Sequence, residues 1–458
     1  MQVTETLSEG LKRAYTVVLP ASDIETRRSE RLVSLGKTLR LPGFRPGKVP
    51  IPVVRQRYGS AVAAEVVEES VNEAARQMLT ERNLRPAMQP KIDVVSEPPG
   101  AADPAKDIEF KVELELLPEI AMPDFGAISL TRLKAEVVPE AIETTLGNIA
   151  KANRALTPIS EQELAERTES PGAAVGEVLT VDFVGKMDGT EFPGGKGEDT
   201  EVELGGTGFI PGFAEQLVGM RPGETRTIEV TFPADYGAAN LAGKQANFDV
   251  TAKQLSKANV PAIDDALADQ LGFGSLEALR EVVSGRMKQE YDSLSRLRIK
   301  RQLLDALSNV ANFASPQGMV DQEFEQIWRR VEADREAGRL DEDDKGKDEE
   351  TLKSEYRAIA DRRVRLGLLL AEIGRTNNIS VSQEEMARAM RAEAARYPGQ
   401  EARMMEFLQK YPSVSDSLRG PIFEDKVVDF VLELAQVNEQ TVTPEALSAE
   451  PPAQTATA

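Results

Sequence analysis

The sequence has no cysteine and no histidine in its 458 residues. These two absences exclude disulfide bonds, zinc sites with thiolate or imidazole ligands, cysteine nucleophiles and Ser-His-Asp triads. Long hydrophobic runs are missing too, because the longest apolar stretch, near Leu366, is far shorter than a membrane span. We therefore expect a protein with no cofactor and no membrane partner, whose chemistry uses neither a histidine base nor a thiolate.

Positive charge is also scarce, with 55 Lys and Arg against 76 Asp and Glu and a net charge of −21. Such a surface repels phosphate, so we expect no DNA binding by the chain as a whole. The charge is unevenly spread, because residues 1–60 carry 11 basic and 5 acidic side chains, a net +6 that leaves −27 for the remainder. The N-terminal segment is therefore the exception to this acidic character.

The N-terminal residues, Met1–Gly10, lack the basic stretch followed by an apolar run that marks a secretory signal. We therefore expect a cytoplasmic protein. At roughly 150 residues per domain, the length corresponds to about three domains. The patterns along the chain predict a multidomain α+β protein.

Residues 1–118 have the pattern of an α+β domain. Ser22, with Glu25 three residues later, matches a capping box and predicts that the first helix opens there. Helical or alternating spacing of apolar residues predicts two helices and three strands: Arg13–Leu19, Ser22–Leu39, Pro52–Leu84, Lys91–Val95 and Ile108–Leu116. Residues 119–164 follow as a connector, since the helical stretch Ala135–Leu156 has no small core of its own.

Residues 165–257 change to short strands separated by glycines, which predicts a compact antiparallel sheet domain with one short helix near Phe213. The predicted strands are Val178–Val184, Glu201–Leu204, Thr225–Thr231 and Ala246–Leu255. Residues 258–438 have amphipathic helical spacing and predict an all-α domain of about five helices. Residues 439–458, rich in Pro, Ala and Thr, are expected to be disordered.

The segment Gly43–Pro50 lies between the two N-terminal helices and places one aromatic ring and two cations on a loop. A helix-helix turn with solvated cations would have the same composition. The loop, Gly-Phe-Arg-Pro-Gly-Lys-Val-Pro, nevertheless resembles the ribosome-docking signature of the trigger factor family. The resemblance implies that its residues contact a ribosomal protein and ribosomal RNA beside the exit tunnel: Gly43, Phe44, Arg45, Gly47 and Lys48.

The sheet segment gathers many of the chain's aromatic residues. Core packing alone explains such a cluster, but five motifs also stand in the order seen in FKBP-type prolyl isomerases: Val181–Gly185, Glu191–Phe192, Gly208–Phe213, Asp235–Gly237 and Phe248–Val250. This resemblance implies a proline pocket lined by Phe183, Phe192, Phe209, Phe213 and Phe248. It also implies that the Ile210 N–H holds a substrate carbonyl and that Tyr236 donates its hydroxyl to the same peptide.

Prolyl isomerisation suits a chain without histidine. Amide resonance sets the barrier at about 18–20 kcal/mol, and the reaction is slow enough to limit folding. The twisted transition state has less charge separation than the planar amide, so a dry aromatic pocket favours it without any titrating group. The expected activity is therefore that of a peptidylprolyl cis-trans isomerase.

The whole chain resembles the trigger factor family in the order of its segments. This implies a ribosome-associated chaperone whose all-α domain forms a cradle with two helical arms for nascent and unfolded polypeptides. A second copy of the chain is a further expected partner, in a homodimer that forms off the ribosome. Methionines can make such a surface adaptable, although ordinary core packing explains each of them equally well: Met287, Met319, Met386, Met390, Met404 and Met405.

Two alternatives remain open at this point. A pure holdase with an inactive FKBP-like domain is suggested by Thr200, where small FKBP enzymes usually carry phenylalanine, and by Pro193, where they usually carry aspartate. A free prolyl isomerase with helical extensions is the other alternative, and the intact docking loop and the missing signal peptide count against it. Ribosome binding and proline-limited refolding separate the three.

Overall fold

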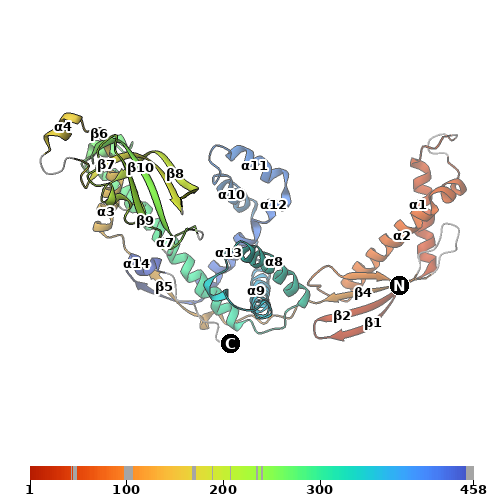
Figure 1. Cartoon of the computed structure of the whole chain (residues 1–458). Helices are drawn as coiled ribbons and strands as arrows, with labels where there is room; N and C mark the ends of the chain where they lie inside the picture. Colours follow the sequence, from red (N-terminus) through yellow and green to blue (C-terminus); the bar gives the residue numbers. More distant parts are fainter. Residues whose placement is uncertain are drawn as a thin grey trace. The chain divides into compact units, whose positions relative to one another are not determined.

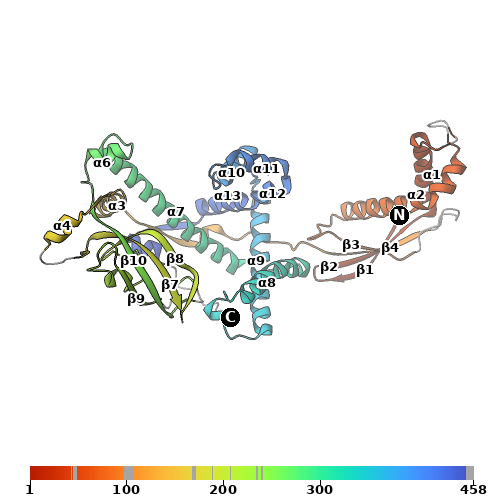
Figure 2. The same ribbon diagram turned by 45° about the horizontal axis from the view of Figure 1, so that its top comes forward.

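The structure is a computed structural model of the whole chain (Figures 1 and 2). It describes residues 1–42, 44, 49–96, 107–167, 172–187, 189–206, 208–233, 236–238 and 241–449. The chain forms two compact units. The first contains Met1–Arg132 and Arg296–Gln440, and the second contains Leu133–Ser295 and Thr441–Ala458.

The first unit begins with a four-stranded antiparallel sheet in the order β1-β2-β4-β3. Its strands are β1 (Gln2–Glu9), β2 (Lys12–Leu19), β3 (Lys91–Val94) and β4 (Ile108–Glu115). Two helices follow β2, α1 (Ala21–Thr38) and α2 (Ile51–Glu81). Alternate residues of β2 and β4 are buried, among them Tyr15, Val17, Phe110 and Val112, and they share one core with the helices. The predicted N-terminal α+β domain is confirmed, with β1 as an unpredicted strand.

The capping box predicted at Ser22 is wrong. Helix α1 begins one residue earlier, with Pro20 at the N-cap, and the Ser22 hydroxyl donates to Asp23 at 3.2 Å. The Ala21 N–H instead donates to Oδ1 of Asp107 at 2.7 Å. A carboxylate 86 positions away thus takes the role that a local motif was expected to fill.

The rest of the first unit is mostly helical. It contains the C-terminal part of α7 (Leu276–Val310), together with α8 (Gln317–Glu336), α9 (Glu349–Thr376), α10 (Gln383–Ala394), α11 (Glu401–Lys410), α12 (Pro412–Asp416) and α13 (Arg419–Leu434). The short 3-10 helices are η1 (Phe125–Ala127) and η2 (Glu342–Asp344). Strand β5 (Ser129–Lys134) pairs with β11 (Gln436–Thr441) beside a core formed by α7, α9 and α13.

We expected about five helices in residues 258–438, and this number is too low. The segment also contains α6 (Asp265–Gln270), and its later part is divided into the short helices α10, α11 and α12. The turn between α10 and α11 contains Pro398 and Gly399, and Gly399 has a positive φ of 81°. Such short helices carry too few turns for periodicity to separate them.

The second unit is built on a five-stranded antiparallel sheet in the order β6-β10-β7-β8, with β9 also paired to β10. Its strands are β6 (Ala155–Pro158), β7 (Glu177–Met187), β8 (Thr190–Glu203), β9 (Thr225–Thr231) and β10 (Gln245–Asn259). The short helix α5 (Phe213–Gln216) packs into the core of this sheet. The predicted antiparallel sheet domain with one short helix is confirmed, although β8 is much longer than predicted.

Helices also pack together within the second unit. These are α3 (Pro139–Ala152), α6 and the beginning of α7, while α4 (Glu161–Glu166) precedes the sheet. Leu146 of α3 is completely buried with Ala268, Leu279 and Val283. The stretch that we expected to be a connector without a core therefore shares a core with residues assigned to the helical domain, because its apolar partners lie more than 100 positions later.

The C-terminal segment is more ordered than predicted. We expected residues 439–458 to be disordered, but they include the end of β11 and the helix α14 (Pro444–Ser448). Thr443 caps α14 with its hydroxyl, and Leu447 is completely buried. One buried leucine gives almost no signal in a segment of this composition. Residues 450–458 lie outside the described part of the chain.

Within the described ranges, no helix combines the length and the apolar character needed to cross a membrane.

Candidate functional site

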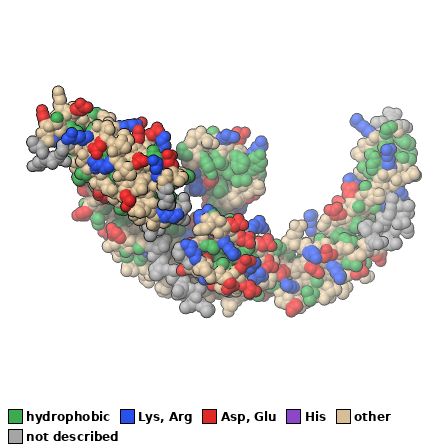
Figure 3. All heavy atoms as spheres, in the orientation of Figure 1, with side chains coloured by type: hydrophobic (Ala, Val, Ile, Leu, Met, Phe, Trp, Pro, Cys, Tyr) green, Lys and Arg blue, Asp and Glu red, His purple; other side chains and the backbone are tan. Residues whose placement is uncertain are grey.

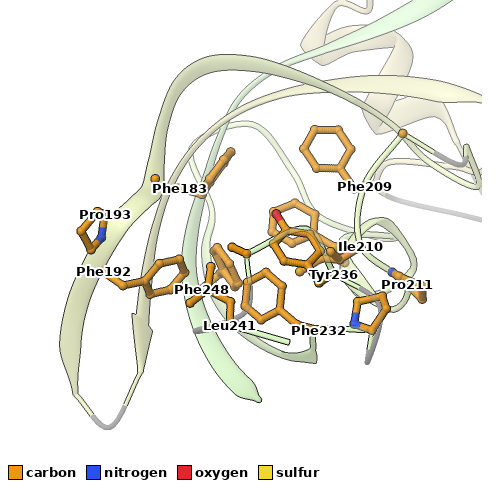
Figure 4. Close-up of a pocket in the computed structure, with 15 residues that line it drawn as sticks. Phe183, Phe192, Pro193, Phe209, Ile210, Pro211, Phe232, Tyr236, Leu241 and Phe248 are labelled. Atoms are coloured by element: carbon orange, nitrogen blue, oxygen red, sulfur yellow. The ribbon is translucent and has the colours of Figure 1, made fainter. Parts of the chain in front are cut away.

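A cavity of about 660 Å³ lies in the sheet of the second unit (Figure 4). Most of its lining is aromatic or proline: Phe183, Phe192, Pro193, Phe209, Pro211, Phe213, Phe232, Pro233, Tyr236 and Phe248. Ile210, Ala238, Leu241 and two glycines complete the described lining. None of these described lining residues carries a charge. All seven residues predicted for a proline pocket therefore lie around one cavity.

Separate elements bring the rings together. Phe183 comes from β7, Phe192 from the start of β8 and Phe248 from β10. Phe209 precedes α5 and Phe213 opens it. Gly212 before that helix has a φ of 87°, a conformation that glycine adopts without steric cost and that allows the chain to turn into α5.

Phe248 is the centre of the aromatic cluster. Its ring centroid lies 5.4 to 6.4 Å from four others, those of Phe183, Phe192, Phe213 and Phe232. The Phe213, Phe183 and Phe192 rings meet it edge to face, which is a favoured aromatic geometry. Phe209 stacks on Phe213 with a centroid distance of 5.2 Å. The wall of the cavity is thus fixed by ring-ring packing.

Gly185 shows how closely the rings approach the backbone of β7. A Cβ atom at this position would lie 2.6 Å from the Phe248 ring and 2.8 Å from the Phe192 ring. Any side chain here would therefore displace two rings of the cavity. This lack of space explains why a glycine stands at the end of the predicted Val181–Gly185 motif.

Two of the lining residues were predicted to hold the substrate through polar groups, Ile210 and Tyr236. Ile210 lines the cavity, and its carbonyl accepts from the Phe213 N–H at 3.1 Å. Tyr236 has an exposed fraction of 39%, and its ring packs 4.7 Å from that of Phe232. Figure 4 shows the Tyr236 hydroxyl pointing into the space between the rings. The Tyr236 hydroxyl is thus placed to meet a bound peptide.

The charged residues nearest these motifs form ion pairs between β7 and β10. Lys253 Nζ lies 2.7 Å from Oδ1 of Asp182, and Lys186 Nζ lies 2.8 Å from Oδ2 of Asp249. The hydrogen bond from Lys253 and that from the Asp199 N–H hold the pKa of Asp182 below its usual range. The hydrogen bonds from Lys186 and Thr227 do the same for Asp249. These carboxylates stay ionised at neutral pH and lie outside the cavity lining.

Sequence reasoning missed part of the lining. Phe232 contacts the Phe192, Tyr236 and Phe248 rings but belongs to none of the five motifs. The alternation of Ile228, Val230 and Phe232 as buried residues could have identified it as inward-facing. Leu241 is a second missed residue, and no local pattern marks it. Thr200 is not among the lining residues, whereas Pro193 is.

The predicted docking loop lies largely outside the described residues. This applies to Gly43, Arg45, Gly47 and Lys48. Phe44 is described, and its exposed fraction of 40% is high for a phenylalanine. Its N–H donates to the Leu41 carbonyl at 3.1 Å. Over the described ranges, no group of acidic side chains is arranged to hold a metal ion.

The sheet, its short helix and the aromatic cavity define the class of FKBP-type prolyl isomerase domains. In agreement, the family model for FKBP-type peptidyl-prolyl cis-trans isomerase matches residues 170–253. The models for bacterial trigger factor protein and for its C-terminus match residues 1–149 and 275–433. The chain belongs to the trigger factor family.

Full-length relatives agree with this assignment. The trigger factor of Granulibacter bethesdensis is 59% identical over 450 residues, which are 98% of each chain. That of Gluconacetobacter diazotrophicus is 58% identical and covers 99% of this chain and 100% of its own. A solved trigger factor chaperone structure matches 94% of this chain and 99% of its own with a TM-score of 0.52, and at 19% identity it supports the fold.

Membership of this family makes the protein a ribosome-associated chaperone with an FKBP-type peptidylprolyl isomerase domain. Its substrates as a chaperone are nascent polypeptides. The predicted fold class, which combines an N-terminal α+β domain, an FKBP-like sheet domain and a helical C-terminal region, is confirmed.

Proposed function

We propose that the cavity binds the proline ring of an X-Pro peptide and that Phe183, Phe192, Phe209, Phe213 and Phe248 form its walls. The observation that carries this proposal is the uncharged, mostly aromatic lining of a cavity of about 660 Å³. Such a lining excludes water from the amide and offers no charge to stabilise its planar, charge-separated form. The twisted transition state is then favoured relative to the ground state.

Two polar groups fix the peptide during rotation in this proposal. The Ile210 N–H donates to a substrate carbonyl, and the Tyr236 hydroxyl donates to the same peptide. Phe232 and Leu241 extend the apolar wall beyond the predicted set. Orientation by two donors reduces the entropy lost on reaching the transition state.

The test of this proposal is isomerase activity of the full chain on a short proline peptide and on a protein whose refolding is limited by proline isomerisation. We expect catalysis of both. Aggregation suppression without either activity would instead identify a holdase with an inactive FKBP-like domain. The variant Tyr236→Phe separates the role of the hydroxyl from that of the apolar wall. Loss of the hydroxyl should lower kcat by about threefold while leaving the wall in place.

The N-terminal loop is proposed to dock the protein beside the exit tunnel, with Phe44 in an apolar recess and Arg45 and Lys48 on acidic or phosphate groups. The exposed Phe44 ring and the net charge of +6 in residues 1–60 support this. Replacing Phe44, Arg45 and Lys48 together by alanine should weaken ribosome binding at least tenfold, which corresponds to a loss of about 1.4 kcal/mol in binding free energy.

Co-sedimentation with ribosomes at moderate salt measures this effect. A matched control removes the same charge elsewhere in the domain, with Lys12→Ala and Arg13→Ala on β2. We expect the control to bind like the wild type and both variants to keep isomerase activity. Undiminished binding of the loop variant would show that docking uses another surface.

The remaining proposals concern location, partners and domains. We propose that the protein acts in the cytoplasm, that it binds no DNA, and that it forms a homodimer when off the ribosome.

We further propose residues 165–257 as an independently folding isomerase domain, and the helical C-terminal region as the surface that holds unfolded chains. Figure 3 shows hydrophobic side chains gathered on the lobe formed by α10, α11 and α12, which supports the last point.

A further inference from the structure

Two strands bulge against the same short segment of β7. On β8, Thr200 pairs with Val181 and Gly197 pairs with Phe183, so three steps along β8 match two steps along β7. On β10, Ala252 pairs with Val181 and Gln254 with the preceding residue of β7, so Lys253 is an extra residue. Bulges of this kind bend a strand and redirect its side chains.

The bulged residues meet at one carboxylate of β7. Oδ1 of Asp182 accepts from the Asp199 N–H at 2.8 Å and lies 2.7 Å from Nζ of Lys253. The same ammonium group lies 2.7 Å from Oδ1 of Asp199. Asp199 has a φ of 50°, a left-handed conformation that aspartate tolerates better than most residues. Asp182 of β7, Asp199 of β8 and Lys253 of β10 thus hold both bulges together.

The β8 bulge sets the position of Gly197 against the cavity. A Cβ atom on Gly197 would lie 2.6 Å from the Phe183 ring, so this ring lies directly on the β8 backbone. Phe183 in turn packs edge to face on Phe213 and Phe248, with centroid distances of 5.6 and 5.9 Å. A shift of the bulge would therefore move a ring of the cavity wall.

We infer that Asp182, Asp199 and Lys253 are positioning residues of the isomerase site, which act on it through Gly197 and Phe183. This inference rests on the proposed function of the cavity. The three side chains are not among the lining residues of the cavity. They fix the backbone on which Phe183 rests, and small displacements of a binding wall are known to lower catalytic efficiency strongly.

Stability alone is a weak reason for this arrangement. Side chains of Lys253, Asp182 and Asp199 are 39%, 34% and 74% exposed, and exposed ion pairs contribute little to folding. The sheet also provides an internal comparison. Lys186 and Asp249 join β7 and β10 at similar exposures, 37% and 40%. The pairing of β7 with β10 is regular there, and the separate register shift of β7 against β8 between Val184 and Lys186 involves neither Asp182 nor Lys253. Removal of Lys186 or Asp249 therefore reports the effect of losing an ion pair without releasing the two bulges.

The test compares Lys253→Met, Lys253→Arg and Lys186→Met in the full chain. The methionine variants keep an unbranched apolar stem and remove the positive charge. The arginine variant retains the positive charge. We measure kcat and KM on a short proline peptide, thermal unfolding, and the aromatic NMR shifts of Phe183.

We expect Lys253→Met to lower kcat about fivefold with KM changed by less than twofold, to shift the Phe183 ring signals, and to leave the unfolding temperature close to that of Lys186→Met. Lys253→Arg should recover at least half of the lost kcat, and Lys186→Met should stay within twofold of the wild type. Equal kcat values for Lys253→Met and Lys186→Met, or unshifted Phe183 signals, would overturn the inference. An inactive wild type would contradict the proposed function, and the Phe183 signals would then still decide whether the three residues position this ring.

Discussion

The cavity of the sheet domain and the lobe of α10, α11 and α12 use apolar side chains in opposite ways. In the cavity the rings point toward one another and Phe213 and Phe248 are almost completely buried. On the lobe, apolar side chains stand in solvent, and four of them are 39% to 45% exposed: Tyr397, Phe407, Tyr411 and Val414. A cavity of fixed shape selects one chemical group, whereas an exposed apolar surface meets many different sequences.

Local structure explains the difference. Four segments of the sheet domain each bring one ring against Phe248, so its ring is held by four aromatic partners. The helices α10, α11 and α12 have 12, 10 and 5 residues, and they offer too little surface to cover each other's apolar side chains. Phe407 and Tyr411 therefore pack on each other with centroids 4.8 Å apart and remain exposed. This difference agrees with the proposal that the first region catalyses isomerisation and the second holds unfolded chains.

The largest expected effect comes from removing the central ring of the cavity. Phe248→Leu keeps an apolar side chain but abolishes four ring-ring contacts, so the wall loses its shape. We expect kcat/KM on a proline peptide to fall at least about tenfold, or 1.4 kcal/mol. Phe430→Leu is the control, because Phe430 packs edge to face on Phe125 in the first unit. If both variants keep full activity, the cavity is not the isomerase site.

A smaller effect is expected on the lobe. Replacing Phe407 and Tyr411 by serine removes two exposed rings that unfolded chains can contact. We expect about three times more protein to be needed for the same suppression of client aggregation, with peptide isomerisation unchanged. Light scattering during client refolding measures this. The control replaces Val94 and Val95 by serine, since these side chains are exposed on the N-terminal sheet. An equal loss of aggregation suppression in the control would mean that the lobe has no special role in holding unfolded chains.

The two regions also differ in what the sequence reveals. The motifs around Phe183, Phe209 and Phe248 predicted the cavity because they stand in the order seen in FKBP-type prolyl isomerases, and the resemblance implies a proline pocket lined by these rings. Phe232 was missed although its alternation with Ile228 and Val230 marks it as inward-facing, whereas Leu241 was missed because no local pattern marks it. The lobe could not be predicted, because amphipathic spacing does not show whether an apolar face finds a partner.

Long-range partners account for the other differences. The cap of α1 by Asp107, the core shared by Leu146 and Leu279, and the two bulges that meet at Asp182 all join residues far apart in the chain. Element boundaries, by contrast, depend on local proline, glycine and apolar spacing, and α1 and α2 begin and end within three residues of the predicted positions.

Acid should loosen the lobe through Glu385. Hydrogen bonds from Lys426 of α13 and from the N–H and hydroxyl of Ser382 lower its pKa to about 2 from an ordinary value of 4.5. The carboxylate therefore stabilises the folded state fully above about pH 4.5, and this stabilisation is lost as the pH falls toward about 2.

Hydrogen exchange of α10 amides, corrected for intrinsic rates, measures this effect. We expect protection to decrease from pH 6 to pH 3 in the wild type and to decrease less in Glu385→Gln, which has no charge to lose. An identical decrease in both proteins would assign the acid sensitivity to other carboxylates.

The smallest expected effect is the pH dependence of catalysis itself. The sequence has no histidine, the side chain that ordinarily changes charge near neutral pH, and no charged residue stands among the described lining residues of the cavity. We therefore expect kcat/KM on a peptide to vary by less than about twofold between pH 6 and 8. A bell-shaped profile in this range would show that proton transfer contributes to the reaction.

The most direct test of the division between cavity and holding surface compares the fragment 165–257 with the full chain on two substrates. On a short proline peptide, we expect equal kcat/KM, because every described lining residue of the cavity lies within the fragment. On an unfolded protein, we expect the fragment to be at least about tenfold less efficient, because it lacks the surface that keeps the chain nearby and raises its effective concentration. Equal efficiency of the fragment and the full chain on the unfolded protein would contradict this account.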